Sequence, residues 1–345
     1  MAQAAATATV VGPTQPIIGS PVIRPPGINV GDPIRVIAPA GAVDATALAK
    51  GTALLETAPF GLQVRQDLSA LLAVELYYAG SDDVRVESLL GAISEMAAVG
   101  GNGTSGRRPR IKAIWAARGG YGTARVLSRV QDTLIPALQT NPCWLVGYSD
   151  LTALIVLWNR ANVLALHGPM ASNIQSFSQA AQNATLAILR GTDAFQQKFS
   201  GSVRFRGNSG GNTVRGRLLG GNLSVLASLV GSGYLPSFQG AILFIEETGE
   251  APYRLDRYLT TLLRSPDFAG IVAIAVGQLV GGDTSTYTAL EMLDLTFAPL
   301  GLPVIAGLPI GHDTTTAMPL VLGAKAEINL QTAQLIVSVP GSGVV

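Results

Sequence analysis

Short apolar runs alternate with longer segments of helical periodicity along the first half of the chain. An apolar run bounded by turn residues is typical of a buried strand, and apolar positions that recur every three or four residues are typical of a helix. The predicted strands are 34–41, 62–65, 111–117, 143–147 and 163–166, and the predicted helices are 44–56, 84–96, 123–130 and 150–159. Strands that alternate with helices through short loops indicate a parallel sheet covered on both faces.

The pattern changes in the second half of the chain. Residues 171–212 are interpreted as a connector with one helix, and a second set of elements follows. Strands are predicted at 216–219, 241–245 and 271–276, helices at 223–230, 253–264 and 285–297, and antiparallel strands in the tail at 318–339. We therefore predict an α/β fold, with a flavodoxin- or Rossmann-like domain at 27–170, a mixed α/β domain at 213–345 and a flexible extension at 1–26.

Composition narrows the classes of function. Among the 345 residues, 48% are hydrophobic, 13% are charged and the net charge is +1, which gives no reason to expect nucleic acid or a membrane surface as a partner. One cysteine, Cys143, excludes an intrachain disulfide and a zinc site of the Cys/His type, and no cofactor is predicted. Residues 1–26 lack the basic and apolar regions of a secretion signal, so a cytoplasmic enzyme is expected.

One stretch of the first half combines strand, turn and helix around a serine. The apolar run from Cys143 reaches Gly147, and Ser149 and Asp150 precede a helix. The nucleophile elbow of hydrolases has this geometry and holds its serine beside free amides of a helix start, although the second glycine of G-x-S-x-G is missing here. The alternative is that Ser149 or Asp150 only caps the helix, and the stretch alone favours capping.

Three other polar groups follow apolar strands. The glycine-rich loop 118–122 is either a close approach of backbone to a ligand or a tight turn, and its spacing fits neither G-x-G-x-x-G nor a P-loop. Any imidazole base must be His167 or His312. His312 lies on a Gly-rich loop, where it is either the base or an exposed, locally bonded loop residue, whereas His167 beside Gly-Pro is more typical of a structural residue. The pair 246–247 is either a solvated strand end, a partner of Arg254 or Arg257, or the residue that orients the base.

Taken in order, these motifs resemble the LD-carboxypeptidase family, the serine peptidases also called muramoyl-tetrapeptide carboxypeptidases. The matching stretches are 34–41, 77–83, 118–122, 147–150, 167–170, 220–223, 244–257 and 311–319. The resemblance implies a triad of Ser149, His312 and Glu246, with the site at the domain interface and no metal. It also implies that the amides of Asp150 and Gly120 hold the oxyanion, and it makes Arg118 and Tyr121 candidates for substrate binding, Arg118 because guanidinium fits a carboxylate.

The same resemblance suggests the substrate. Members of this branch form an acyl-enzyme and remove the terminal D-Ala from murein tetrapeptides, free or sugar-linked, by cutting the bond that follows an L-configured centre of diaminopimelate or lysine. This implies a homodimer that acts in cytoplasmic peptidoglycan recycling. Two alternatives stay open: a microcin-C-type immunity peptidase, disfavoured by the sequence 247–254 and a short connector, and a non-catalytic binder of peptidoglycan fragments.

Overall fold

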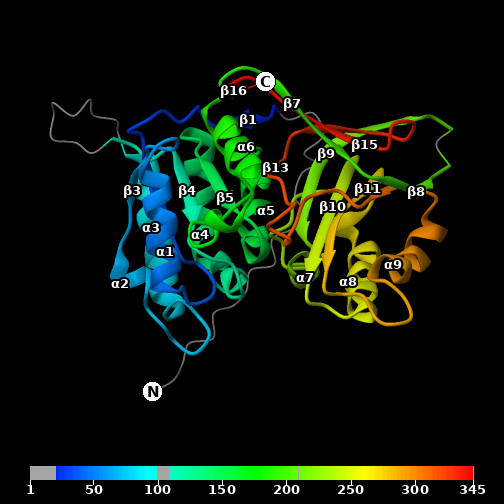
Figure 1. The fold of residues 1–345 in the computed structure, drawn as a ribbon, viewed down its shortest axis with the longest axis horizontal. Helices are drawn as coiled ribbons and strands as arrows, with labels where there is room; N and C mark the ends of the chain where they lie inside the picture. The colour runs from blue at the N-terminus through cyan, green and yellow to red at the C-terminus, as the bar shows by residue number, and fades with distance from the viewer. Residues whose placement is uncertain (1–20, 99–108, 209, 345) are drawn as a thin grey trace.

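The first half of the chain forms the predicted parallel sheet. The computed structural model describes residues 21–98, 109–208 and 210–344, and within them five parallel strands carry a sixth, antiparallel strand at one edge (Figure 1). In spatial order the strands are β13 (Leu320–Leu322), β6 (Ala165–His167), β5 (Trp144–Gly147), β4 (Ala113–Ala116), β2 (Pro33–Ile37) and β3 (Gln63–Arg65). The helices are α1 (Ala45–Glu56), α2 (Leu68–Leu71), α3 (Asp82–Ala97), α4 (Thr123–Thr140) and α5 (Thr152–Arg160).

The burial of this sheet is that expected of parallel strands joined by helices. Every residue of β4, β5 and β6 is buried, as expected when helices cover both faces. On one side α3, α4 and α5 lie next to one another. The carboxyl ends of β4, β5 and β6 lead into the loop 118–122, Ser149 and His167, so all three motifs meet at one edge of the sheet.

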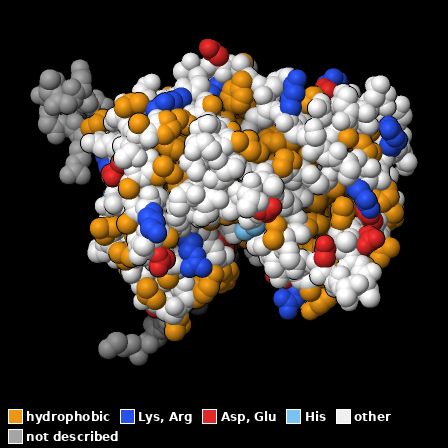
Figure 2. All heavy atoms as spheres, viewed as in Figure 1, with side chains coloured by type: hydrophobic (Ala, Val, Ile, Leu, Met, Phe, Trp, Pro, Cys, Tyr) orange, Lys and Arg blue, Asp and Glu red, His pale blue; other side chains and the backbone are white. Residues whose placement is uncertain are grey.

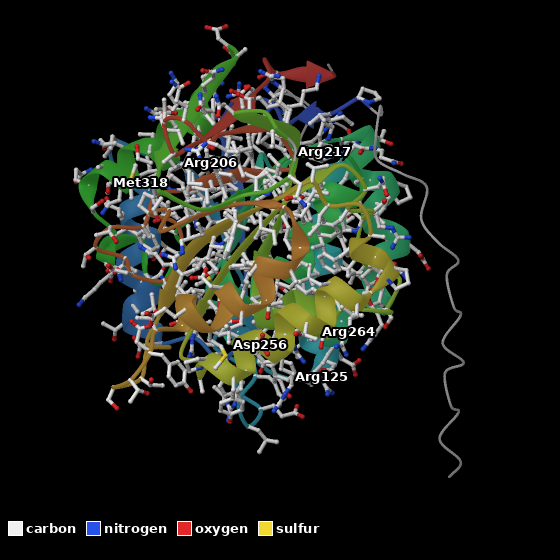
Figure 3. All side chains as sticks on the ribbon, turned by 90° about the vertical axis from the view of Figure 1, so that its right-hand side faces the viewer. Arg125, Arg206, Arg217, Asp256, Arg264 and Met318 are labelled. Atoms are coloured by element: carbon white, nitrogen blue, oxygen red, sulfur yellow. The ribbon has the colours of Figure 1, made fainter. Side chains whose placement is uncertain are left out.

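The second half forms a mixed sheet of eight strands. Its strands are, in spatial order, β7 (Phe195–Ser200), β15 (Gln334–Val339), β14 (Lys325–Asn329), β9 (Thr213–Asn222), β10 (Ala241–Thr248), β11 (Ala273–Val280), β12 (Pro303–Ala306) and β8 (Ser202–Arg206). The central strands β9 to β12 are parallel, and the strands outside them are antiparallel. Helices α7 (Leu223–Ser228), α8 (Pro252–Arg264) and α9 (Ala289–Phe297) pack beside it; Figure 3 labels Asp256 and Arg264 on α8. The α/β prediction for both halves is confirmed.

The segment 171–212, predicted as a connector, differs from that prediction. Its helix is present as α6 (Gln179–Arg190), but β7 and β8 follow and occupy the two opposite edges of the C-terminal sheet. Both strands alternate between exposed residues and buried or half-buried ones, because one face of an antiparallel pair can lie in water. The second half of this segment is therefore part of the C-terminal sheet.

The N-terminal extension was predicted to be flexible up to residue 26, but its residues 21–26 are held in the fold. Strand β1 (Ile23–Arg24) pairs with β16 (Gly343–Val344) near the C-terminus. Arg24 is fully buried and donates to the backbone carbonyls of Ile188, Gly191, Asp193 and Pro340, which fixes this segment against α6. The earlier part of the extension lies outside the described residues. So do most residues of the Gly- and Arg-rich stretch 100–110, for which the sequence predicts a surface loop.

One strand from the C-terminal half of the chain belongs to the N-terminal sheet and connects the two domains. After β12 the chain passes His312, returns to the N-terminal sheet as β13, and pairs Leu320 with His167 of β6. This path brings a loop of the C-terminal half to the edge of the N-terminal sheet that carries Ser149. In the described part of the chain, no helix is long and apolar enough to cross a lipid bilayer.

Candidate active site

Ser149 occupies a strained turn between β5 and α5. Its φ is +62°, a left-handed conformation that is uncommon for a residue other than glycine. Gly147 makes the turn possible, because a Cβ there would lie 2.9 Å from Cγ of Leu151 and 3.0 Å from Cβ of Ala116. The predicted sequence of strand, turn and helix is present, with a short 3₁₀ turn (Ser149–Leu151) before α5.

Neither residue of the Ser-Asp pair caps the helix that follows it. No side chain caps the 3₁₀ turn or α5. Asp150 instead accepts a hydrogen bond from the backbone N–H of Thr123 at 2.8 Å, and so caps the start of α4. Burial raises the pKa of Asp150, and the hydrogen bonds from Thr123 act against that rise. The Asp150 side chain therefore fixes the glycine-rich loop that precedes α4 beside the serine turn.

The glycine-rich loop 118–122 lies directly against the serine. A Cβ on Gly119 would be 3.0 Å from Cβ and 3.2 Å from Oγ of Ser149, so only glycine leaves the hydroxyl free. Gly120 and Gly122 have φ of +108° and +133°. The buried guanidinium of Arg85 donates to the carbonyl of Gly122 at 2.8 Å and holds the end of the loop. The loop is therefore a tight turn whose backbone lies against the side chain of Ser149, and its approach to a ligand stays a prediction.

Glu246 and His312 form a buried hydrogen-bonded pair. His312 Nδ1 lies 2.6 Å from Oε2 of Glu246, whose side chain is fully buried on β10. Burial alone raises the pKa of Glu246, but His312 and His167 outweigh it and hold the pKa below its usual range. Burial lowers the pKa of His312, and the carboxylate of Glu246 more than reverses this, so that the net shift is upward. An ionised Glu246 therefore faces Nδ1 of an imidazole that is 15% exposed.

Glu247, the next residue of β10, points elsewhere. Its oxygens accept hydrogen bonds from Asn222 Nδ2 at 2.7 Å and from the backbone N–H of Ser224 at 2.8 Å, at the start of α7. Arg254 pairs with Glu250, so the alternative of an ion pair with the 246–247 carboxylates does not apply to it. Both Glu246 and Glu247 are buried within the strand, which also excludes a solvated strand end.

His167, which the sequence suggested to be a structural loop residue, lies next to Glu246. It ends β6, is 2% exposed, and places Nε2 3.6 Å from Oε1 of Glu246. Glu246 thus lies between both histidines of the chain. The sequence held a signal for this contact, because His167 follows a strand whose carboxyl end lies at the same edge of the sheet as Ser149.

A cavity of about 270 Å³ joins the residues from both domains. It is lined by Asp44, Arg118, Gly119, Gly120, Tyr148, Ser149, Met170, Ser172, Asn173 and His312. Figure 2 shows a histidine at the hollow between the two halves of the molecule. Tyr121 is half-exposed and packs near Tyr78, outside the residues that line the cavity. The predicted residues Ser149, His312, Arg118 and Gly120 therefore share one cavity, and Tyr121 lies apart from it.

Comparison with known proteins identifies the family. Models of the LD-carboxypeptidase N-terminal and C-terminal domains match residues 34–168 and 215–328. A Bacillus subtilis protein named "probable murein peptide carboxypeptidase" is 30% identical over 89% of this chain and 91% of its own length. The chain belongs to the LD-carboxypeptidase family. It is therefore an enzyme, a carboxypeptidase that hydrolyses peptide bonds.

Two solved structures are similar to this chain in fold. A muramoyltetrapeptide carboxypeptidase from Oxalobacter formigenes aligns with a TM-score of 0.73 at 25% identity, over 90% of this chain and 99% of its own. The microcin C7 self immunity protein MccF aligns with a TM-score of 0.75 at 20% identity, over 94% of this chain and 100% of its own, which shows a shared fold.

Proposed function

We propose that this LD-carboxypeptidase is a serine peptidase that releases the terminal D-Ala from murein tetrapeptides. The observation that carries the proposal is the shared cavity: a serine on a strained turn and an imidazole held by a buried carboxylate face the same space. A hydroxyl nucleophile needs this combination of base and orienting acid. The names of the murein relatives support the choice of substrate.

The proposed reaction begins at the carbonyl that precedes D-Ala. Oγ of Ser149 forms a bond to that carbon while His312 takes the hydroxyl proton at Nε2, and Glu246 holds the protonated ring through Nδ1. The amides of Gly120 and Asp150 donate to the oxyanion. When the C–N bond breaks, His312 passes its proton to the departing amine of D-Ala and leaves an acyl-serine. Water then attacks the ester carbon and gives a proton to His312. The bond from that carbon to Oγ breaks, and His312 returns the proton to Oγ, which regenerates Ser149 and releases the tripeptide acid.

Arg118 is the residue proposed to bind the carboxylate of D-Ala. Its side chain is exposed, lines the cavity on the same loop as Gly119 and Gly120, and donates to the carbonyl of Ala42. A guanidinium offers two parallel donors to one carboxylate, which suits an enzyme that removes only a C-terminal residue. A homodimer and a place in cytoplasmic peptidoglycan recycling remain predictions from the family resemblance.

The test is release of D-Ala from a defined tetrapeptide. Purified protein is incubated with tetrapeptides that carry either diaminopimelate or lysine at the third position, and free D-Ala and tripeptide are measured by mass spectrometry. Equal release with and without EDTA is expected, since no metal takes part in the proposed steps. Ser149→Ala is expected to lose turnover while still binding the peptide. Full activity of Ser149→Ala would contradict the proposal.

A second candidate is cleavage of a peptidyl-sulfamoyl nucleotide. The fold likeness to MccF favours it, since that protein is described in complex with glutamyl sulfamoyl guanosine. The same Ser149, Glu246 and His312 would act in either case, so the substrate decides between them. Faster turnover of an aminoacyl-sulfamoyl nucleoside than of the tetrapeptides would favour this candidate, and the opposite order would reject it.

A further inference from the structure

Two buried polar atoms face each other beside the proposed triad without a hydrogen bond. They are Nε2 of His167 and Oε1 of Glu246, at 3.6 Å, and neither has another hydrogen-bond partner in the described part of the chain. Buried carboxylate oxygens are nearly always paired, because an unpaired one loses its hydration without compensation. A closure of about half an ångström would bring this pair within ordinary hydrogen-bond length. Each atom is thus the available partner of the other.

The surroundings of His167 leave its ring little freedom. Tyr148 lies 5.6 Å away and Phe244 5.7 Å away, measured between ring centroids. The backbone of His167 pairs with Leu320 in the antiparallel ladder between β6 and β13. His167 is buried and is not among the residues that line the cavity that holds Ser149. Its Nε2 faces the carboxylate because strand and neighbouring rings hold it there.

We propose that His167 is a positioning residue whose Nε2–H donates to Oε1 of Glu246. The carboxylate would then bridge both imidazoles of the chain: His167 from the N-terminal domain and His312 from the C-terminal half. His167 keeps Glu246 in one rotamer and in its ionised form while His312 exchanges its proton with Ser149. This inference rests on the proposed function of Ser149 and His312, and it adds a residue that is not a member of their triad.

The consequence for pH dependence has a definite sign. The titratable groups that face Glu246 are His312, His167, Tyr148 and Glu247, and Glu247 is itself held by Asn222 and Ser224. Loss of the His167 donor leaves Oε1 without a partner and favours the protonated carboxyl. The Glu246–His312 pair then binds a proton more readily. The acid limb of kcat/KM therefore moves to higher pH, since the active form needs an ionised Glu246 and a neutral His312.

Two substitutions of similar size separate the donor from the shape of the ring. His167→Phe keeps the ring and removes the donor, and we expect kcat to fall on the order of tenfold with KM unchanged. Its acid limb should move up by roughly half a pH unit or more. His167→Gln keeps a donor near the position of Nε2 and should restore both values. His167→Asn, one methylene shorter, replaces the Phe variant if that protein does not fold.

A buried polar residue away from Glu246 provides the matched control. Asn159 is buried and donates to the carbonyls of Val163 and Leu322. Asn159→Leu should lower the melting temperature and leave the pH profile unchanged. Equal losses in His167→Phe and His167→Gln, or a wild-type profile in a folded His167→Phe, would overturn the inference.

Histidine NMR separates failure of this inference from failure of the proposed function. In Ser149→Ala, with and without His167→Phe, the Cε1–H signal of His312 is followed against pH; two histidines give two signals, and the double variant assigns them. We expect the His312 titration to move to higher pH when His167 is removed. An unmoved titration overturns the inference even if the enzyme is active. A moved titration, together with a wild-type protein that does not cleave tetrapeptides, upholds the contact and rejects the proposed substrate.

Discussion

Ser149 and His312 come from different domains, and their surroundings differ in kind. Around Ser149 the controlling feature is backbone: a φ of +62° and two glycines, Gly147 and Gly119, that leave room for the turn and the hydroxyl. Around His312 the controlling feature is buried charge, with Glu246 fully buried at 2.6 Å from Nδ1. The proposed nucleophile is thus placed by steric fit, whereas the proposed base is placed and tuned by electrostatics.

This contrast predicts different responses to substitution. Around Ser149, one added methyl group should lower the activity and leave its pH dependence nearly unchanged. Around His312, removal of one charge should lower the activity even if the side chain keeps its shape, and it should also change the pH dependence.

The largest effect is expected from removal of the Glu246 charge. Glu246→Gln keeps the shape but permits the wrong imidazole tautomer and no longer stabilises the protonated ring, so kcat should fall roughly 10³- to 10⁴-fold. The measurement is D-Ala release under saturating tetrapeptide.

The neighbouring carboxylate provides the control for Glu246. Glu247→Gln removes a buried charge from the same strand, but one that is bound to Asn222 and to the N–H of Ser224. It should lower the melting temperature and reduce kcat far less. If kcat falls more in Glu247→Gln than in Glu246→Gln, the imidazole is oriented by Glu247 and the assignment to Glu246 is wrong.

Addition of a methyl group beside the nucleophile should have the next largest effect. Gly119→Ala places a Cβ 3.0 Å from Cβ of Ser149, and displacement of the hydroxyl by a few tenths of an ångström should lower kcat by about 10²-fold. Gly91→Ala is the matched control, because Gly91 lies in α3 with no atom within 4 Å of the added Cβ. The control should gain slight stability and keep full activity. Equal activity of the two variants would show that the serine turn tolerates movement.

Periodicity and motif order predicted much of the architecture from sequence. Fully apolar strands such as β4 and β5 are evident as short runs, and the turn at Gly147 follows from the residues around it. The edge strands β7 and β8 were missed because half of their residues face water, which makes them similar to a polar connector. Arg24 was missed because its acceptors are four carbonyls distant in sequence, which no local pattern reveals.

Contacts between residues distant in sequence also limited what could be predicted about the site. Family motifs gave Glu246 and His312 together, and the structure places them in contact. His167 was interpreted as structural, because its partner is a carboxylate from the other domain and the contact depends on how β13 joins the two sheets. The role of Asp150 as the cap of α4 was also beyond local analysis, since capping is usually sought in the helix that follows the residue.

A moderate effect is expected at Arg118, the one guanidinium among the described residues that line the cavity. Arg118→Ala removes the proposed partner of the D-Ala carboxylate and should raise KM about tenfold or more, with a smaller change in kcat. Arg118→Lys should recover only part of the affinity, because an ammonium lacks the paired donors of guanidinium. Tyr121→Ala, on the same loop but outside the cavity lining, should leave KM nearly unchanged. An unchanged KM in Arg118→Ala would move the carboxylate site elsewhere.

The smallest effect is a shift of a titration midpoint, and it tests the electrostatic half of the contrast directly. The pKa of His312 is raised above its ordinary value of 6.5. Since the base must be neutral, activity should be lost as the pH falls through a midpoint above 6.5.

In the inactive Ser149→Ala background, Glu246→Gln should move the NMR midpoint of His312 down by roughly one pH unit, because burial then acts unopposed by the Glu246 carboxylate. Glu247→Gln should move it in the same direction by much less, since its charge also raises the pKa of His312 but without a hydrogen bond to the ring. Gly119→Ala in the same background should not move it at all, because a methyl group carries no charge. A midpoint that shifts equally in all three would mean that packing, and not the Glu246 charge, sets the proton affinity of the base.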